Sequence, residues 1–177
     1  MIYQKITDNF YRLENVLSDE LQIEILEHFK DTSSWDSLPD ANNINRLELH
    51  LHTNSMIAEK IFKTLKHITT IAEEVVGKLY PNSPQLWLDH AGYMSRMHKD
   101  FSPNIKVNIQ VYLDNGAENM GTACFDTQWL RVPYKKNTGY MLISPTEITH
   151  GMYMPVIDKR LSLYQSYRST INALDLW

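Results

Sequence analysis

The spacing of apolar residues predicts two helices in the first half of the chain. The first follows Ser18, a residue type that caps helices, and its apolar positions are Leu21, Ile25, Leu26 and Phe29. The second begins at Asn54 or Ser55 and ends between Gly77 and Pro81. Its apolar positions are Ile57, Ile61, Leu65, Ile68, Ile71 and Val75. Such a stripe is typical of an amphipathic helix that covers a core. Residues 9–17 and 46–52 are predicted to form short strands.

After Pro84 the pattern changes to short runs rich in β-branched and aromatic residues. They occupy residues 85–97, 106–115, 122–126, 130–134, 139–144 and 159–169, and Gly, Asn and Pro separate them. Many short strands at regular spacing indicate a sandwich or barrel. The predicted fold class is therefore α+β and mainly β, with the helices packed on a C-terminal β body.

Composition limits the class of protein. The chain has 177 residues, of which 43% are hydrophobic and 21% are charged, and this is typical of one globular domain. A net charge of −4 argues against nucleic acid or an anionic membrane as a partner. Cys124 is the only cysteine, so an internal disulfide is excluded. With neither a signal peptide nor a membrane span predicted, we expect a cytoplasmic protein.

One candidate metal site is the group Glu48, His50 and His52. Alternate residues of a strand share a face, so these three side chains have a spacing capable of chelation. The preferred interpretation is a solvent-facing polar side of a strand whose leucines face the core.

A stronger candidate is His98-x-Asp100, followed fifty residues after Asp100 by His150. Two histidines and one carboxylate without a thiolate suit non-haem iron(II), with open positions left for other ligands. Arg160 follows, and Ser162 shares its strand face. The planar fork of an arginine can hold a carboxylate through two hydrogen bonds. A dicarboxylate chelated to the metal at one end would meet Arg160 and Ser162 at the other.

Taken in order, His98-x-Asp100, His150 and Arg160-x-Ser162 resemble the iron(II)/2-oxoglutarate-dependent oxygenases. The resemblance covers about residues 86–169 and includes "KVNIQVYLDN", "NMGTACFD" and the closing strands from "NTGYMLIS" to "KRLSLYQSYR". The start, "FYRLENVLSDELQIEILEHF", is similar to the N-terminal support of the prolyl-4-hydroxylase-like branch.

The resemblance implies a double-stranded β-helix, a jelly-roll barrel, over residues 86–169, supported by residues 1–85 in a single domain of residues 1–177. It implies Fe(II) on His98, Asp100 and His150, and 2-oxoglutarate as co-substrate, with ascorbate as a candidate reductant. The implied reaction uses O₂ to hydroxylate a C–H bond of a small molecule or peptide, with release of succinate and CO₂. A peptidyl proline or an amino-acid-like molecule is the favoured substrate.

Two positions depart from that branch. Ser95 stands where a tyrosine is common, so Tyr93 or Tyr112 is the candidate for a tyrosine contact to 2-oxoglutarate. Ile143-Ser144 stands where a phenylalanine is common.

The sequence is compatible with several substrate contacts and with rival functions. Arg96, Trp129, Arg131 and Tyr134 are the candidate substrate residues, the last three because they lie in a segment predicted to be rich in loops. The polar face of residues 106–113 faces either solvent or a cavity. One alternative is an oxygenase that demethylates nucleic acid or a modified base, and another is a non-catalytic β-barrel that binds a ligand.

Overall fold

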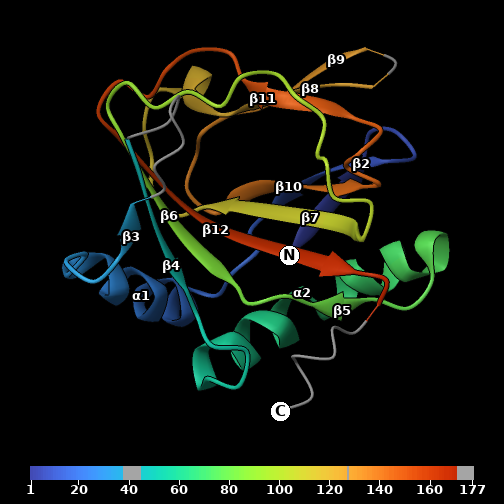
Figure 1. Ribbon diagram of the computed structural model, residues 1–177, viewed down its shortest axis with the longest axis horizontal. Coiled ribbons are helices and arrows are strands. Elements are labelled where there is room, and N and C mark those ends of the chain that lie inside the picture. Colours follow the sequence, from blue (N-terminus) through green and yellow to red (C-terminus); the bar gives the residue numbers. More distant parts are fainter. Residues whose placement is uncertain (38–44, 127, 171–177) are drawn as a thin grey trace.

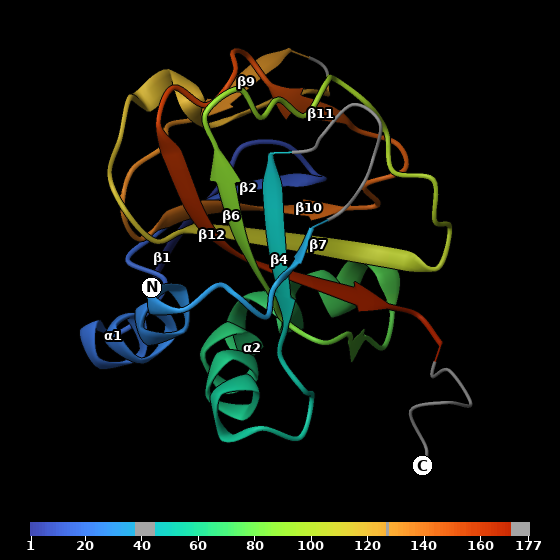
Figure 2. The same ribbon diagram turned by 60° about the vertical axis from the view of Figure 1, so that its left-hand side comes forward.

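A computed structural model describes residues 1–37, 45–126 and 128–170. Two antiparallel sheets face each other, as the predicted β body requires. In Figure 1 the larger sheet crosses the middle of the molecule, the smaller sheet lies above it and both α-helices lie below. Figure 2 shows from another side that the helices cover only the outer face of the larger sheet. The space between the sheets therefore remains for the candidate site.

The larger sheet has the order β1-β2-β10-β7-β12-β6-β4-β3, and β5 also pairs with β12. Its strands are β1 (Ile2–Lys5), β2 (Phe10–Glu14), β3 (Asp36–Ser37), β4 (Arg46–His50), β5 (Tyr80–Pro81), β6 (Gln85–His90), β7 (Ile105–Tyr112), β10 (Thr138–Ile143) and β12 (Lys159–Arg168). Both predicted early strands are present, as β2 and β4. The short strands β1, β3 and β5 were not predicted.

The smaller sheet has the order β11-β8-β9 and consists of β8 (Thr122–Phe125), β9 (Trp129–Val132) and β11 (Thr149–Met152). The one-turn helix η2 (Glu118–Met120) leads into β8. The predictions for residues 122–126 and 130–134 are largely confirmed. His150 was expected between strands, but it lies within β11, because the pairing of that short segment with β8 is tertiary and its apolar pattern is weak.

Serine caps begin both α-helices, as expected. The hydroxyl of Ser18 accepts a hydrogen bond from the N–H of Leu21 at the start of α1 (Asp19–Glu27), which continues into η1 (His28–Lys30). Ser55 caps α2 (Met56–Val76) in the same way through the N–H of Ala58. The apolar stripe of α2 is buried on the larger sheet at Ile61, Leu65, Ile68 and Ala72. The helices therefore stabilise the outer face of that sheet.

Alternation along the strands sends apolar side chains outward to the helices and polar ones inward. On β7, Val107, Ile109 and Val111 belong to the core under the helices, whereas Asn108 and Gln110 face the space between the sheets. This decides the open question about residues 106–113 in favour of the cavity.

Glu48, on β4, corrects the expectation of a solvent-facing polar side. It is 6% exposed and contacts the buried Arg46, whereas His50 is exposed. The pattern misled because the polar side of this strand faces the space between the sheets.

The strand predicted over residues 85–97 is too long. β6 ends at His90, and Gly92 then adopts a positive φ of 89°, a conformation that favours glycine. The chain crosses to the smaller sheet, where His98 and His150 exchange backbone hydrogen bonds of 2.9 and 2.8 Å. This crossing puts the two candidate histidines side by side.

In the described part of the chain, no helix is both long and apolar enough to cross a membrane.

Candidate metal centre and its cavity

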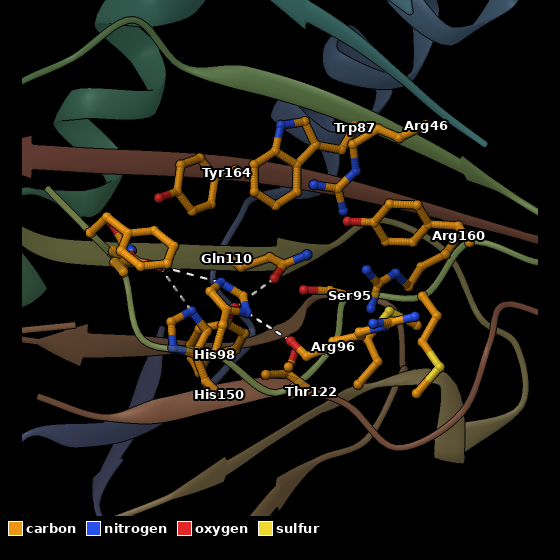
Figure 3. A pocket seen from close by; sticks show the side chains of 18 residues that line it. Arg46, Trp87, Ser95, Arg96, His98, Gln110, Thr122, His150, Arg160 and Tyr164 are labelled. Carbon is orange, nitrogen blue, oxygen red and sulfur yellow. Dashed lines mark hydrogen bonds and ion pairs between the residues drawn. The ribbon is translucent and has the colours of Figure 1, made fainter. Parts of the chain in front are cut away.

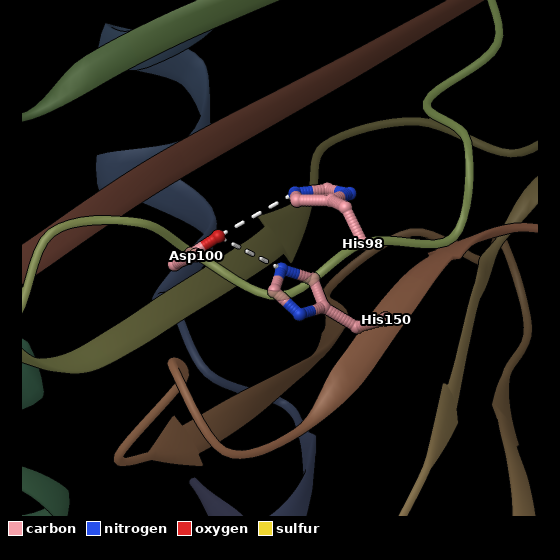
Figure 4. A group of neighbouring side chains, drawn as sticks. All are labelled: His98, Asp100 and His150. Carbon is pink, nitrogen blue, oxygen red and sulfur yellow. Dashed lines mark ion pairs between the residues drawn. The ribbon is translucent and has the colours of Figure 1, made fainter.

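His98, Asp100 and His150 come together as predicted. Each offers one ligand atom, and these atoms all lie within 4.8 Å of one another. Oδ1 of Asp100 lies 3.4 Å from Nε2 of His98 and 3.5 Å from Nε2 of His150. Figure 4 shows both rings directing a nitrogen at the same carboxylate. Within the described residues this is the group of His, Cys, Asp and Glu side chains that could hold a metal ion; Glu48, His50 and His52 do not form one.

Backbone carbonyls fix which nitrogen of each ring carries the proton. Nδ1 of His98 lies 2.7 Å from the carbonyl oxygen of Arg96, and Nδ1 of His150 lies 3.1 Å from that of Ile148. Because a carbonyl only accepts, each Nδ1–H donates, and in the neutral ring Nε2 keeps its lone pair. The two lone pairs and the Asp100 carboxylate then converge on one point, as metal ligation requires.

Neighbouring groups keep Asp100 ionised. Burial raises the pKa of Asp100, but its contacts with His98, His150 and Asn108 outweigh burial and bring the pKa below its usual value. The Nδ2 amide of Asn108 donates to Oδ2, which leaves Oδ1 toward the histidines. The carboxylate is thus both charged and oriented toward the metal position.

The two histidines titrate differently. Burial lowers the pKa of His150, whereas the hydrogen bond with Asp100 raises the pKa of His98. His150 is therefore neutral and ready to ligate near pH 7, and a metal at this site has to compete with a proton for His98. The donor set of two imidazoles and one carboxylate fits a divalent non-haem iron and leaves open positions on the metal.

The triad opens into a cavity of about 410 Å³ between the two sheets. Figure 3 shows the aromatic side chains of Trp87 and Tyr164 on one side, His98 and His150 on the opposite side, and Arg160 at the end away from the histidines. The remaining lining residues are Arg46, Tyr93, Met94, Ser95, Arg96, Asp100, Phe101, Asn108, Gln110, Thr122, Tyr140, Gly151 and Met152. Its walls thus combine aromatic rings, polar side chains and three arginines.

Arg160 is almost fully buried and faces this cavity, but it is already paired. Its Nε and Nη2 atoms lie 2.8 and 2.7 Å from Oδ2 of Asp89, and Nη1 donates to the carbonyl of Met120 at 3.0 Å. A guanidinium has five N–H groups, so one N–H on each terminal nitrogen remains for a ligand. Arg160 can therefore still donate to the carboxylate of a ligand, as predicted. The carboxylate of Asp89, from the chain itself, holds the same guanidinium.

The two candidate tyrosines differ in position. Tyr93 lines the cavity, and burial raises its pKa to about 12, so its hydroxyl is neutral near pH 7. Tyr112 is fully buried behind Thr122, to which its hydroxyl is hydrogen-bonded at 2.6 Å. Tyr93 is therefore the tyrosine with access to a ligand.

Ser162 does not line the cavity. It is fully buried, and its hydroxyl accepts a hydrogen bond of 3.0 Å from Nε2 of Gln110, which lies between it and the open space. The serine was expected to contact a carboxylate directly; the structure instead gives it a role in holding Gln110.

Of the four candidate substrate residues, only Arg96 lines the cavity. Trp129 and Arg131 lie on β9 and not in a loop, and the Arg131 guanidinium stacks on Tyr153 at 4.0 Å. Tyr134 is buried, and its hydroxyl accepts the N–H of Leu161. The predicted strand over residues 130–134 thus begins one residue earlier, at Trp129, where β9 pairs with β8.

The lining residues that sequence reasoning missed include Arg46, Trp87 and Tyr164. Trp87 and Tyr164 are stacked with ring centroids 4.2 Å apart, and the Arg46 guanidinium lies 3.9 Å from the Trp87 ring. Alternate residues of a strand share a face, so Trp87 lies on the face of Asp89 and Tyr164 on the face of Arg160. This alternation could have predicted both aromatic residues. No local signal marked Arg46, which precedes the glutamate of the rejected metal candidate.

No protein-family model matches the sequence, and no curated protein matches it. Solved structures do match. A Pseudomonas putida prolyl-4-hydroxylase superimposes with a TM-score of 0.76 at 14% identity, over 94% of this chain and 96% of that one. A Trichoplax adhaerens prolyl hydroxylase, in complex with a hypoxia inducible factor peptide, gives 0.76 at 11% identity, over 93% and 86%. HygX from Streptomyces hygroscopicus, with nickel and 2-oxoglutarate bound, gives 0.71 at 10% identity, over 94% and 85%.

These matches cover nearly the whole chain while the sequences have diverged widely. The protein therefore has the double-stranded β-helix fold of the 2-oxoglutarate oxygenases, in the arrangement found in prolyl-4-hydroxylases. The predicted fold class is confirmed. A fold alone does not assign chemistry, so the function rests on the site.

Proposed function

We propose that this protein is an Fe(II)- and 2-oxoglutarate-dependent dioxygenase that hydroxylates a C–H bond of a second substrate. The observation that carries the proposal is the convergence of the Nε2 atoms of His98 and His150 and one Asp100 oxygen beside a cavity that Arg160 also lines. The fold is that of enzymes solved with 2-oxoglutarate and with nickel or iron, which supports the same pairing here.

His98, Asp100 and His150 would hold the iron and occupy one face of its coordination sphere. When bound, the metal would supply O₂ activation coupled to decarboxylation of 2-oxoglutarate to succinate and CO₂. The chain's own contribution is to hold the three ligands. The carbonyls of Arg96 and Ile148 fix the rings, and Asn108 fixes the carboxylate.

The co-substrate would lie between the metal position and Arg160. The guanidinium is buried, and it retains one N–H on each terminal nitrogen for the far carboxylate. Tyr93, neutral near pH 7, lines the same end and can donate a further hydrogen bond. Burial strengthens these contacts because little water screens them.

The second substrate would approach along the aromatic wall of Trp87 and Tyr164. Stacked rings with an exposed Phe101 nearby favour an apolar or cyclic group over a highly charged one. Arg96, exposed on the cavity rim, is the proposed polar contact. A peptidyl proline or an amino-acid-like molecule fits this wall, and the similar structures include prolyl hydroxylases. A small-molecule or peptide substrate in the cytoplasm, without nucleic acid, remains our prediction.

The test is turnover of 2-oxoglutarate. Purified protein with Fe(II), ascorbate and 2-oxoglutarate should release succinate, and release should rise with proline-containing peptides or free cyclic amino acids. An Asp100→Ala variant should release none above background, because the carboxylate ligand is lost. Equal succinate release by the folded variant and the wild type would refute the assignment. Absence of iron binding would instead favour a ligand-binding β-barrel without turnover.

A further inference from the structure

Arg46, Asp89 and Arg160 form one rung across three neighbouring strands. Asp89 on β6 is the direct partner of Arg46 on β4 and of Arg160 on β12. Neighbouring strands lie about 4.8 Å apart, so side chains on one rung and one face touch. Figure 2 shows β4, β6 and β12 side by side. The two arginines are thus brought to one place by sheet register, although far apart in sequence.

Both arginines use the same carboxylate. Arg46 donates from Nε to Oδ1 of Asp89 at 2.6 Å and from Nη2 to Oδ2 at 3.2 Å, and Arg160 binds Oδ2 from the other side. Asp89 is fully buried, and Arg46 and Arg160 are 9% and 2% exposed. Two buried guanidiniums therefore share the carboxylate of Asp89, and Arg46 has a second buried carboxylate, that of Glu48, as an ion-pair partner. Glu48 lies farther off, with 3.7 Å between Oε1 and Nη1 of Arg46.

The ring of Tyr93 lies close to both guanidinium groups. Its ring centroid lies 4.2 Å from the Arg46 guanidinium carbon and 5.9 Å from that of Arg160. The Trp87 ring centroid lies 3.9 Å from the same Arg46 carbon. Arg46 is therefore held rigidly by two rings and a carboxylate, which lowers the entropy cost of binding a ligand. All three of Arg46, Tyr93 and Arg160 line the cavity.

The donors exceed the acceptors in this cluster. Asp89 accepts from both arginines, and Met120 supplies one carbonyl to Arg160. Each guanidinium has five N–H groups, so several remain after these contacts are made. The unused N–H groups of both guanidiniums can donate to a further anion, and the cavity that both arginines line is the route by which an anion reaches them.

We propose that Arg46, Asp89 and Arg160 form a two-arginine centre for the far carboxylate of the dicarboxylate co-substrate. In this centre Arg46 is a second binding residue beside Arg160, and Asp89 positions both guanidiniums. The proposal rests on the function proposed above and deepens it. It makes selectivity for a dicarboxylic 2-oxo acid depend on a residue of β4, a strand outside the segment from 86 to 169 that carries the other candidate ligands.

The experiment compares two 2-oxo acids that differ only at the far end. 2-Oxopentanoate has the five-carbon chain of 2-oxoglutarate but a methyl group in place of the far carboxylate. Each is titrated without oxygen into Fe(II)-loaded protein, and binding is followed by the visible absorption of the chelate. An Arg46→Gln variant should bind 2-oxoglutarate about ten- to a hundredfold more weakly, because a charge-assisted contact is lost. Its affinity for 2-oxopentanoate should change less than about twofold.

Two further variants serve as a control and as a conservative substitution. Arg131→Gln removes an exposed arginine of β9 outside this cavity and should leave both affinities unchanged. Arg46→Lys keeps the charge without the planar fork and should weaken 2-oxoglutarate binding by a smaller factor, about three- to tenfold. If Arg46→Gln does not fold, the Arg46→Lys variant tests the two-arginine centre in its place.

The outcomes separate the two proposals. Wild-type affinity for 2-oxoglutarate in the Arg46 variants, or an equal loss for both acids, would overturn the two-arginine centre and leave the oxygenase assignment standing. Failure of the iron-loaded wild-type protein to bind 2-oxoglutarate would overturn the oxygenase assignment itself and the inference with it.

Discussion

The Nδ1 atom of His98 lies 2.7 Å from the carbonyl oxygen of Arg96, two residues earlier in the chain. This contact fixes the ring so that Nε2 faces Asp100. His150 makes the corresponding contact with Ile148. The candidate metal centre is therefore oriented by the backbone of two adjacent segments before any metal arrives, and several consequences can be measured.

Loss of one histidine ligand should abolish tight metal binding. In His150→Ala only two ligands remain, so affinity for Fe(II), or for Mn(II) as a stable substitute, should fall at least about a hundredfold. Equilibrium dialysis with metal analysis measures this. His52→Ala, which removes an exposed histidine after β4, is the matched control and should bind like the wild type. Similar affinities for the two variants would contradict the assignment of His150.

Asn108 should act on metal binding through Asp100. Asn108→Ala removes the amide that holds Oδ2 of the carboxylate, so Asp100 becomes free to rotate away from the histidines. Metal affinity should fall about ten- to a hundredfold, the usual effect of removing a group that orients a ligand. Thermal unfolding of the metal-free protein is the control measurement. An unchanged metal affinity in a folded variant would show that Asn108 does not orient Asp100 for metal binding.

Gly151 should not tolerate a side chain. A Cβ at this position would lie 2.7 Å from the carbonyl oxygen of Arg96 and 2.9 Å from the amide nitrogen of Met97. Both atoms are backbone of the segment that carries His98, so Gly151→Ala has to push this segment away from β11. We expect about 1–3 kcal/mol of destabilisation in denaturant unfolding, together with weaker metal binding. Wild-type stability and affinity would show that the two segments are not in close contact.

Asp114 should make stability fall as pH rises. Burial raises its pKa from 3.8 to about 6, so the folded state binds more protons than the unfolded state between these values. Stability supplied by the protonated form is therefore present at low pH and is lost as pH rises through about 6. Asp114→Asn should be more stable than the wild type at pH 8, by an amount on the order of 1 kcal/mol because the group is only partly buried. The difference should vanish near pH 4. A difference independent of pH would contradict this origin.

Much of the fold could be predicted from the sequence because its signals are local. The caps Ser18 and Ser55 and the apolar stripe of α2 are set within a few turns of helix, and the structure has them as expected except at Val75, which is exposed. β1, β3, β5 and β11 were missed because strands of two to four residues carry too little pattern of their own and depend on pairing with another segment. Residues 36–45 are rich in Asn, Asp and Pro, a composition that predicts a loop. The first two of them form β3, and residues 38–44 lie outside the described part of the chain.

In the candidate site too, residues with a local sequence signal could be predicted, whereas residues placed by strand pairing could not. His98, Asp100, His150 and Arg160 could be found because spacing and residue type mark them, and the structure places them around one cavity. Arg46 could not be found, because its role comes from the register that aligns β4, β6 and β12. Ser162 was expected to contact the ligand. It shares the inward face of β12 with Arg160, but Gln110 covers it.

The central claim is that His98, Asp100 and His150 hold iron which 2-oxoglutarate then chelates. The most direct test is made without oxygen, by adding Fe(II) and then 2-oxoglutarate to the purified protein and recording the visible absorption spectrum. We predict a charge-transfer band that appears only when metal and 2-oxoglutarate are both present, and that is absent in Asp100→Ala. Folded wild-type protein that gives no band would contradict the assignment.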